Sequence, residues 1–268
     1  MTHEIWWRLG CFFGILFILM LMEAYKPARK SPIKNSQRWA ANYGLVFAST
    51  IIARVTLPIG LTAVALYNQQ HQIGLFNHLS YFTSAEMPNW AIILFSLFVL
   101  DIIIYWQHRL FHQIPLLWRF HRVHHADAHI DTSTGLRFHP IEILASIVIK
   151  LLAITLLGIP TLAVLIFEIT LNGLALFNHA NIRLPRLIEK YVRLLLMTQI
   201  LHRIHHSQVS HETNSNYGFS VVWWDKLFGS YKAKALKNDN NLDIGLKEFP
   251  NTKQNASFLS LLTMPFKK

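Results

Sequence analysis

Histidines are the residues of this sequence with the clearest capacity for chemistry. The chain has 268 residues and 15 histidines, most of which crowd into residues 108–211. His108 and His112 are four residues apart, a spacing that places both imidazoles on one face of a helix. Two imidazoles on one helix face can chelate a metal ion.

Two histidine triplets with identical spacing stand some eighty residues apart. They are His121, His124, His125 and His202, His205, His206. In each triplet all three rings share one helix face. At this histidine frequency one such triplet arises by chance in about one sequence in twenty, so two independent triplets indicate a function. By contrast, His71 and His78 are interpreted as ordinary surface residues of a loop.

Three further histidines stand near these clusters. His179 ends an apolar run, and a buried imidazole there needs a partner. His139 precedes Pro140 and has Glu142 three positions on, so capping of a helix explains it as well as ligation does. His211 is interpreted as a residue outside the ligand set or a plain surface residue.

Nine histidines are too many ligands for a single ion, so we predict a site with two metal ions. Imidazole suits iron, zinc and copper alike, whereas a single cysteine, Cys11, excludes a cysteine cluster within this chain. Four side chains close in sequence to the ligands could orient their second ring nitrogens: Asp127, Asp131, Asn178 and Glu212. The predicted ligands are His108, His112, His121, His124, His125, His179, His202, His205 and His206, with His139 as a possible further ligand or supporting residue.

The elements that must position these histidines are membrane helices. The sequence is 52% hydrophobic and only 15% charged, too apolar for an ordinary soluble domain. Apolar runs long enough to cross a bilayer cover 5–22, 40–66 and 89–107. Two more, 141–157 and 161–180, are separated only by Gly158-Ile159-Pro160 and predict a helical hairpin. The expected fold is therefore an all-α, multi-pass membrane bundle of about four spans with a histidine-rich cap that holds two metals.

The distribution of basic residues predicts the orientation. Residues 26–38 hold five lysines and arginines, whereas residues 68–88 hold none. We therefore expect the N-terminus outside, all histidine clusters on the cytoplasmic side, and a bacterial inner membrane in preference to the endoplasmic reticulum. The net charge of +11 has this membrane explanation, so we expect no nucleic-acid partner.

The remainder of the chain is less informative. Residues 183–200 combine basic and leucine-rich faces, as an interfacial helix or a plain surface helix would. Residues 257–266 form a short apolar segment that packs back or touches the membrane. We treat 1–268 as one domain, with N-terminal spans in 1–89, a core in 90–231 and a polar tail in 232–268.

These motifs resemble the fatty acid hydroxylase and sterol desaturase superfamily of membrane di-iron enzymes. The resemblance covers most of 90–231, and its motifs are Asp101–His112, His121–His125, Arg137–Pro140, Asn178–His179, His202–His206, Asn216–Gly218 and Trp224–Gly229. It implies two irons and the hydroxylation or desaturation of a lipid with O2; zinc could replace iron in the isolated protein. Some members carry another histidine where this chain has Arg183, a place that His139 or water could fill.

The resemblance does not identify the electron donor or the lipid substrate. No nucleotide fingerprint, haem module or iron–sulfur module is visible, so the electrons must come from a separate donor similar to cytochrome b5 or ferredoxin. The lipid itself stays open among sterols, fatty acyl chains and related lipids. One alternative is a metal transporter, which would place its ligands near mid-bilayer. Another is a bis-histidine haem cytochrome, which would leave both triplets idle.

Overall fold

A computed structural model describes residues 3–31, 35–78, 89–250 and 256–267. Parts of three segments discussed above lie outside these residues: 32–34 of the basic loop, 79–88 of the base-free loop and 251–255 of the tail. The described residues form helices and loops with only isolated β-bridges, so the all-α prediction is confirmed.

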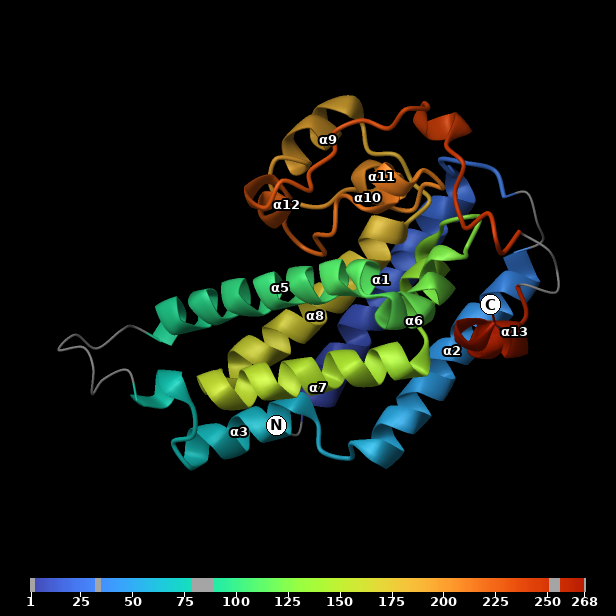
Figure 1. Cartoon of the computed structure of the whole chain (residues 1–268). Helices are drawn as coiled ribbons and strands as arrows, with labels where there is room; N and C mark the ends of the chain where they lie inside the picture. The colour runs from blue at the N-terminus through green and yellow to red at the C-terminus, as the bar shows by residue number, and fades with distance from the viewer. Residues whose placement is uncertain (1–2, 32–34, 79–88, 251–255, 268) are drawn as a thin grey trace.

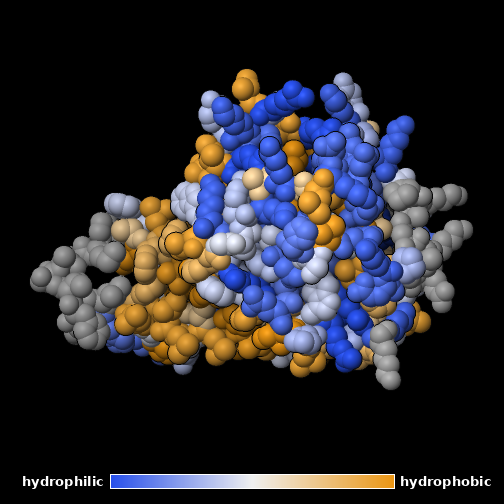
Figure 2. Space-filling view, turned by 45° about the horizontal axis from the view of Figure 1, so that its top comes forward, coloured by the Kyte–Doolittle hydropathy of each residue, from blue (hydrophilic) through white to orange (hydrophobic). Residues whose placement is uncertain are grey.

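Five helical stretches are long and apolar enough to cross a membrane. They comprise α1 (Glu4–Tyr25), α2 (Asn35–Thr56) with α3 (Leu61–Gln70) and η1 (Leu75–His78), α5 (Asn89–Gln113), α7 (Pro140–Leu157) and α8 (Thr161–His179). Figure 1 shows these helices side by side, with the smaller elements gathered at one end and flank of the bundle. In Figure 2 the bundle surface is largely hydrophobic, whereas the end that carries the smaller elements is mostly hydrophilic.

The run expected over 40–66 is interrupted between α2 and α3. Pro58 lacks a backbone N–H and disfavours helical geometry in the residue before it, and Gly60 adopts extended backbone as the N-cap of α3. After this break α3 packs on α7 and α8.

The expected hairpin is formed by α7 and α8. Gly158 ends α7 in the left-handed region, at φ +68°, where glycine is favoured. A Cβ on Gly158 would lie 2.7 Å from the carbonyl oxygen of Ile73, and Gly74 approaches Gly158 equally closely from its own side. The turn of the hairpin is thereby held against the segment that leads into η1.

The cap consists of short elements from both sides of the hairpin. Their bounds are α6 (Pro115–His125), η2 (Thr132–Leu136), α9 (Arg186–Val192), α10 (Gln199–His205), α11 (Ser210–Thr213), α12 (Trp223–Leu227) and η3 (Asp239–Asn241). The amphipathic helix expected over 183–200 is confined to α9, because Leu196 pairs with Val221 in a β-bridge instead of continuing the helix.

The C-terminal residues pack back onto the bundle. α13 (Phe258–Thr263) and η4 (Met264–Phe266) place Leu261 and Met264 in a buried cluster with Ala41 and Leu45 of α2. The polar tail is anchored as well, because Asp239 accepts hydrogen bonds from the guanidinium group of Arg203.

Candidate metal centre

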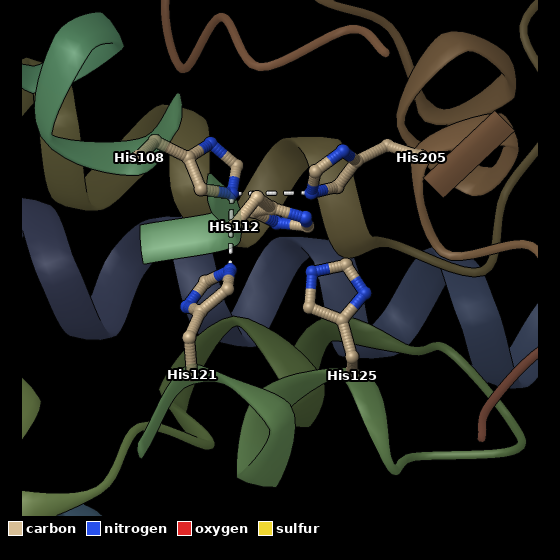
Figure 3. Close-up of side chains that lie close together, drawn as sticks. All are labelled: His108, His112, His121, His125 and His205. Atoms are coloured by element: carbon tan, nitrogen blue, oxygen red, sulfur yellow. Dashed lines mark hydrogen bonds between the residues drawn. The ribbon is translucent and has the colours of Figure 1, made fainter. Parts of the chain in front are cut away.

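Five of the predicted histidines converge in a first group. α5 extends past the apolar run, so His108 and His112 project from its last turns, and α6 begins at Pro115 and turns back towards them. The members are His108, His112, His121, His125 and His205, each offering one ring nitrogen within 4.8 Å of the others (Figure 3). All are buried except the half-buried His112.

The other four predicted histidines form a second, adjacent group. Its members are His124, His179, His202 and His206, and all four are buried. The two groups are in contact, because the ring of His125 stacks on that of His206 with centroids 4.3 Å apart. The structure therefore divides each triplet between the groups, so that α6 and α10 each contribute to both.

The tautomers of three rings in the first group are set by acceptors at Nδ1. A carbonyl or carboxylate oxygen can only accept, so each Nδ1 carries the proton and each Nε2 carries a lone pair when the ring is neutral. The pairs are His108 with the carbonyl of Tyr217 (2.7 Å), His121 with Oε1 of Glu142 (2.6 Å) and His205 with the carbonyl of Ser215 (2.7 Å).

These three lone pairs meet at one point. The Nε2 of His108 lies 3.2 Å from the Nε2 of His121 and 3.1 Å from that of His205 (Figure 3). No proton is available between them, so this arrangement is repulsive unless a cation lies among the nitrogens. Ligand bonds of about 2.1 Å at right angles separate neighbouring nitrogens by about 3.0 Å, so the spacing fits a metal ion.

The second group has a similar spacing of ring nitrogens, and an acceptor sets the tautomer of one of its rings. The Nδ1 of His179 donates to the carbonyl of Ala175 at 2.6 Å, so its Nε2 carries a lone pair. That Nε2 lies 3.1 Å from the Nε2 of His124 and 2.8 Å from that of His202. The Nε2 atoms of His206 and His202 are 3.2 Å apart.

The surroundings keep the cap histidines neutral. Burial lowers the pKa of His205 to about 3, and it lowers the pKa values of His124, His125 and His202 well below their ordinary value. A metal ligand must be deprotonated at the binding nitrogen, and these rings meet that condition at neutral pH.

Several histidines lie outside both groups. His139 is the N-cap of α7, where its Nδ1 accepts from the backbone N–H of Ile141. His71 is exposed and stacks on Tyr67, and His211 is exposed on α11. His78, in η1, belongs to neither group. Arg183 points away from the second group and pairs with Asp239.

The sequence of residues 93–230 matches the family model for fatty acid hydroxylase, which is half of the chain. The chain belongs to the fatty acid hydroxylase family. This confirms the resemblance drawn from the histidine motifs.

Named relatives of this family member act on several lipids. The chain is 28% identical to ornithine lipid hydroxylase OlsE of Rhizobium tropici over 99% of this chain and 77% of that protein. It is 25% identical to methylsterol monooxygenase 2-2 of Arabidopsis thaliana over 85% of each. It is 31% identical to human alkylglycerol monooxygenase over 50% of this chain but only 29% of that protein. No solved structure matches the chain.

The family match and the apolar helices identify the chain as an integral membrane oxidoreductase related to lipid hydroxylases and monooxygenases. The orienting groups, however, differ from those expected in the sequence. Asp127 and Asp131 pair with Arg38 instead of a ligand ring. Asn178 donates to the carbonyl of Phe219, and Glu212 accepts from the backbone N–H of Leu236.

Glu142 is the orienting residue that sequence reasoning missed. It was noted only as the third residue of a helix, yet its carboxylate holds the Nδ1 of His121, which lies 21 positions earlier. Backbone carbonyls orient His108, His179 and His205, and no residue type marks such a carbonyl in a sequence. The sequence offered one indication of the role of Glu142: it lies in the first turn of a helix that begins at the pair His139-Pro140.

Proposed function

We propose that this member of the fatty acid hydroxylase family is a membrane-bound lipid hydroxylase whose nine converging histidines hold two iron ions. The observation that carries the proposal is the meeting of three proton-free Nε2 atoms in the first group, those of His108, His121 and His205. Its relatives include named hydroxylases and monooxygenases, which favours hydroxylation over desaturation.

The donor set fits a redox metal. When bound, two irons would supply the activation of O2 and the attack on an unactivated C–H bond, which no side chain can perform. The chain's own residues orient the ligands and exclude water. The carboxylate of Glu142 makes His121 a stronger ligand, and burial keeps the rings of the cap deprotonated.

The electrons and the lipid come from outside the described chain. We propose a separate electron donor, similar to cytochrome b5 or ferredoxin, that reaches the cap from the aqueous side. The basic segment 26–38 supports a cytoplasmic position for this cap. We propose a bacterial inner membrane as the location.

Metal content and lipid analysis test this function. The purified protein should contain about two irons per chain and show no Soret band. Lipid extracts from cells with and without the gene, compared by mass spectrometry, should differ by lipids that carry one additional oxygen. Loss of two hydrogens would instead indicate desaturation, and a gene-independent lipid profile would contradict the proposal.

A further inference from the structure

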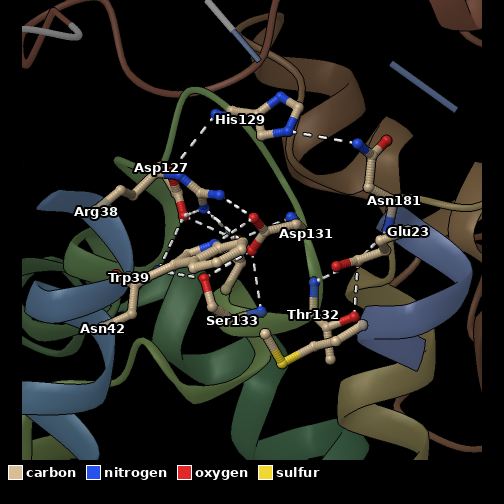
Figure 4. A network of polar contacts seen from close by, with 12 residues as sticks. Glu23, Arg38, Trp39, Asn42, Asp127, His129, Asp131, Thr132, Ser133 and Asn181 are labelled. Atoms are coloured by element: carbon tan, nitrogen blue, oxygen red, sulfur yellow. Dashed lines mark hydrogen bonds and ion pairs between the residues drawn. The ribbon is translucent and has the colours of Figure 1, made fainter. Parts of the chain in front are cut away.

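A cavity of about 300 Å³, lined by both polar and apolar residues, lies beside the second histidine group, and none of its lining residues belongs to either histidine group. Four segments line it: the end of α1 with the residues that follow it, the start of α2, the loop that leads from α6 to η2, and the residues just after α8. Figure 4 shows Glu23, Trp39, His129 and Asp131 in this region, with Asn181 next to them. Its volume is at the lower end of the range for small-molecule sites.

The cavity is joined to the metal centre through the backbone. Asn181 is two residues beyond His179, and its side-chain Nδ2 lies 3.4 Å from the Nε2 of His129. η2 packs on α8 so closely that a Cβ on Gly135 would lie 2.8 Å from the carbonyl of Ala175, the acceptor of His179. A molecule in the cavity is therefore a near neighbour of the second group.

One wall of the cavity is acidic. Oε1 of Glu23 accepts from the backbone N–H groups of Thr132 and Asn181 at 2.7 and 2.6 Å, which fixes the carboxylate at the cavity. Asp131 accepts from the indole N–H of Trp39 at 2.9 Å and pairs with the buried Arg38. Because Arg38 compensates Asp131, the charge of Glu23 is the one that a bound cation would neutralise.

The neighbouring side chains also suit an ammonium group. The indole of Trp39 lines the cavity, and its face attracts cations. Burial lowers the pKa of His129 to about 4, so its ring is neutral at pH 7 and does not repel a cation. The exposed Lys30 also lines the cavity, whereas the guanidinium group of Arg29, another lining residue, donates to the backbone carbonyls of Asp239 and Leu242.

The cavity lies where a lipid headgroup would be. It is bounded by Met20 and Ala24 in the last turns of α1, a helix apolar enough to span the membrane, and by Pro27 just beyond it. Acyl chains in the bilayer could therefore extend past α1 while the polar end of the same molecule enters the cavity.

From these observations we propose that the cavity binds the headgroup of the substrate lipid, and that this headgroup is a zwitterion with a primary ammonium and an anionic group. Glu23 and Trp39 bind the ammonium, and Lys30 binds the anionic group. The proposal rests on the proposed lipid hydroxylase function and gives it a substrate class. An amino-acid lipid and an aminophospholipid both carry these two groups.

Binding of defined lipids to the iron-loaded protein in detergent, measured by native mass spectrometry, tests the headgroup site. The probes are ornithine lipid, its N-acetylated form, phosphatidylethanolamine and phosphatidylglycerol. The amine lipids should bind at least about tenfold more tightly than the N-acetylated lipid and phosphatidylglycerol, since a charge-assisted hydrogen bond is lost with the amine. Tighter binding of ornithine lipid or of phosphatidylethanolamine identifies which anionic group fits.

Glu23→Gln is the informative variant, because glutamine keeps Oε1 as an acceptor and removes only the charge. It should reduce the affinity for the amine lipids about tenfold, and Lys30→Gln should weaken binding through the anionic group of the lipid. Glu4→Gln, at the other end of α1, is the matched control and should change nothing. All variants should keep their iron content.

Equal binding of the amine and N-acetylated lipids, or unchanged affinity in both cavity variants, would overturn the headgroup site. Lipid oxidation is scored separately. Lipid oxidation that does not depend on the amine would contradict the headgroup site but would agree with the proposed hydroxylase function. Amine-dependent binding without any lipid oxidation would support the headgroup site and contradict the hydroxylase function.

Discussion

At the level of single residues, a metal centre in this chain depends on neutral imidazoles whose lone pairs point to common positions. The acceptors at Nδ1 decide this, because they force the proton away from the Nε2 atoms of His108 and His205. Without a cation, the converging lone pairs of the first group would repel one another. The removal of any one ring should therefore weaken metal binding more than the removal of an exposed histidine.

Alanine substitution tests the ligand set. His124→Ala and His205→Ala each remove a ligand from a different group, so each should lower metal affinity and lipid oxidation by at least about 10–100-fold. Metal content and product formation are the measurements, and His211→Ala on the exposed surface is the control. If both ligand variants, shown to be folded and inserted, kept wild-type metal content and activity, the two-metal site would be wrong.

His139 should behave differently from the ligands. Its ring caps α7 through the backbone N–H of Ile141 and lies outside both groups. His139→Ala should keep the full metal content and lose about 1 kcal/mol of stability, as loss of a helix cap commonly does. Denaturation in detergent and metal analysis measure the two effects. A metal loss as deep as that of His124→Ala would make His139 a ligand.

The metal-free protein should become less stable in mild acid. His205 has a pKa of about 3 in the folded protein and an ordinary value of about 6.5 when unfolded. Between these values the unfolded chain binds a proton that the folded chain does not, so stability falls as pH drops below about 6.5. From pH 7 to 5 His205 alone should cost on the order of 2 kcal/mol.

Thermal unfolding of chelator-treated protein at pH 7 and pH 5 measures this effect. His205→Gln removes one titrating group, so the decline of its melting temperature over the same interval should be smaller. A melting temperature that does not change between these pH values would contradict the argument.

The histidine spacing predicted eight of the nine rings that come together, because i, i+3 and i+4 positions share a helix face, and the end of an apolar run added His179. It could not predict how they divide. His121 and His125 join the first group while His124 joins the second, and this depends on how α6 crosses α5 and α10. The headgroup cavity was missed for a similar reason, since Glu23 and His129 are 106 positions apart and meet only in the fold.

At the level of elements, two short helices do most of the positioning. α6 and α10 each contribute rings to both groups, and α5 and α8 bring further ligands at the ends of long apolar helices. The hydrophobic runs predicted the ends of α7 and α8 to within one residue, because the length of each apolar run and the turn from Gly158 to Pro160 together determine where the two helices begin and end. Hydropathy could not predict the short cap elements, whose ends depend on tertiary contacts.

α9 and α12 form an exposed apolar surface on the cap. Leu187 of α9 and Leu227 of α12 are 71% and 69% exposed, and Lys190 and Lys226 stand on the same two helices. Lys226 of α12 donates to the carbonyl of Leu194, two residues beyond the end of α9. Exposed leucines beside lysines are typical of an element that lies in the membrane interface.

A fluorophore on α9 should therefore contact lipid. In a Cys11→Ser background, Leu187→Cys carries the label and the protein is placed in vesicles that contain brominated lipids. The label should be quenched, whereas the same label on His211→Cys, an exposed site of α11, should not. Equal, weak quenching at both positions would make α9 a plain surface helix.

At the level of the whole molecule, five span-length stretches place the two ends of the chain on opposite sides of the bundle. Figure 1 shows the N-terminus beside α3 and the C-terminus near α13 and the start of α2. The histidine groups lie towards the second of these ends, since α5 and α8 reach them at their C-termini and α7 begins there. The membrane orientation of the entire site thus depends on which end faces the cytoplasm.

Reporter fusions test this orientation. Five lysines and arginines in 26–38 against none in 68–88 predict that the first segment stays in the cytoplasm, because translocation of short basic loops is disfavoured. A reporter active only in the cytoplasm should work after Lys34 and fail after Gln70, and a reporter active only outside should give the opposite result. The fold requires opposite sides, because a single span-length stretch, α2 with α3, separates the two positions. If both fusions reported the same side, the five-span arrangement would be wrong. If the fusion after Lys34 were outside and the fusion after Gln70 were cytoplasmic, the histidine groups would face outside, away from a cytoplasmic electron donor.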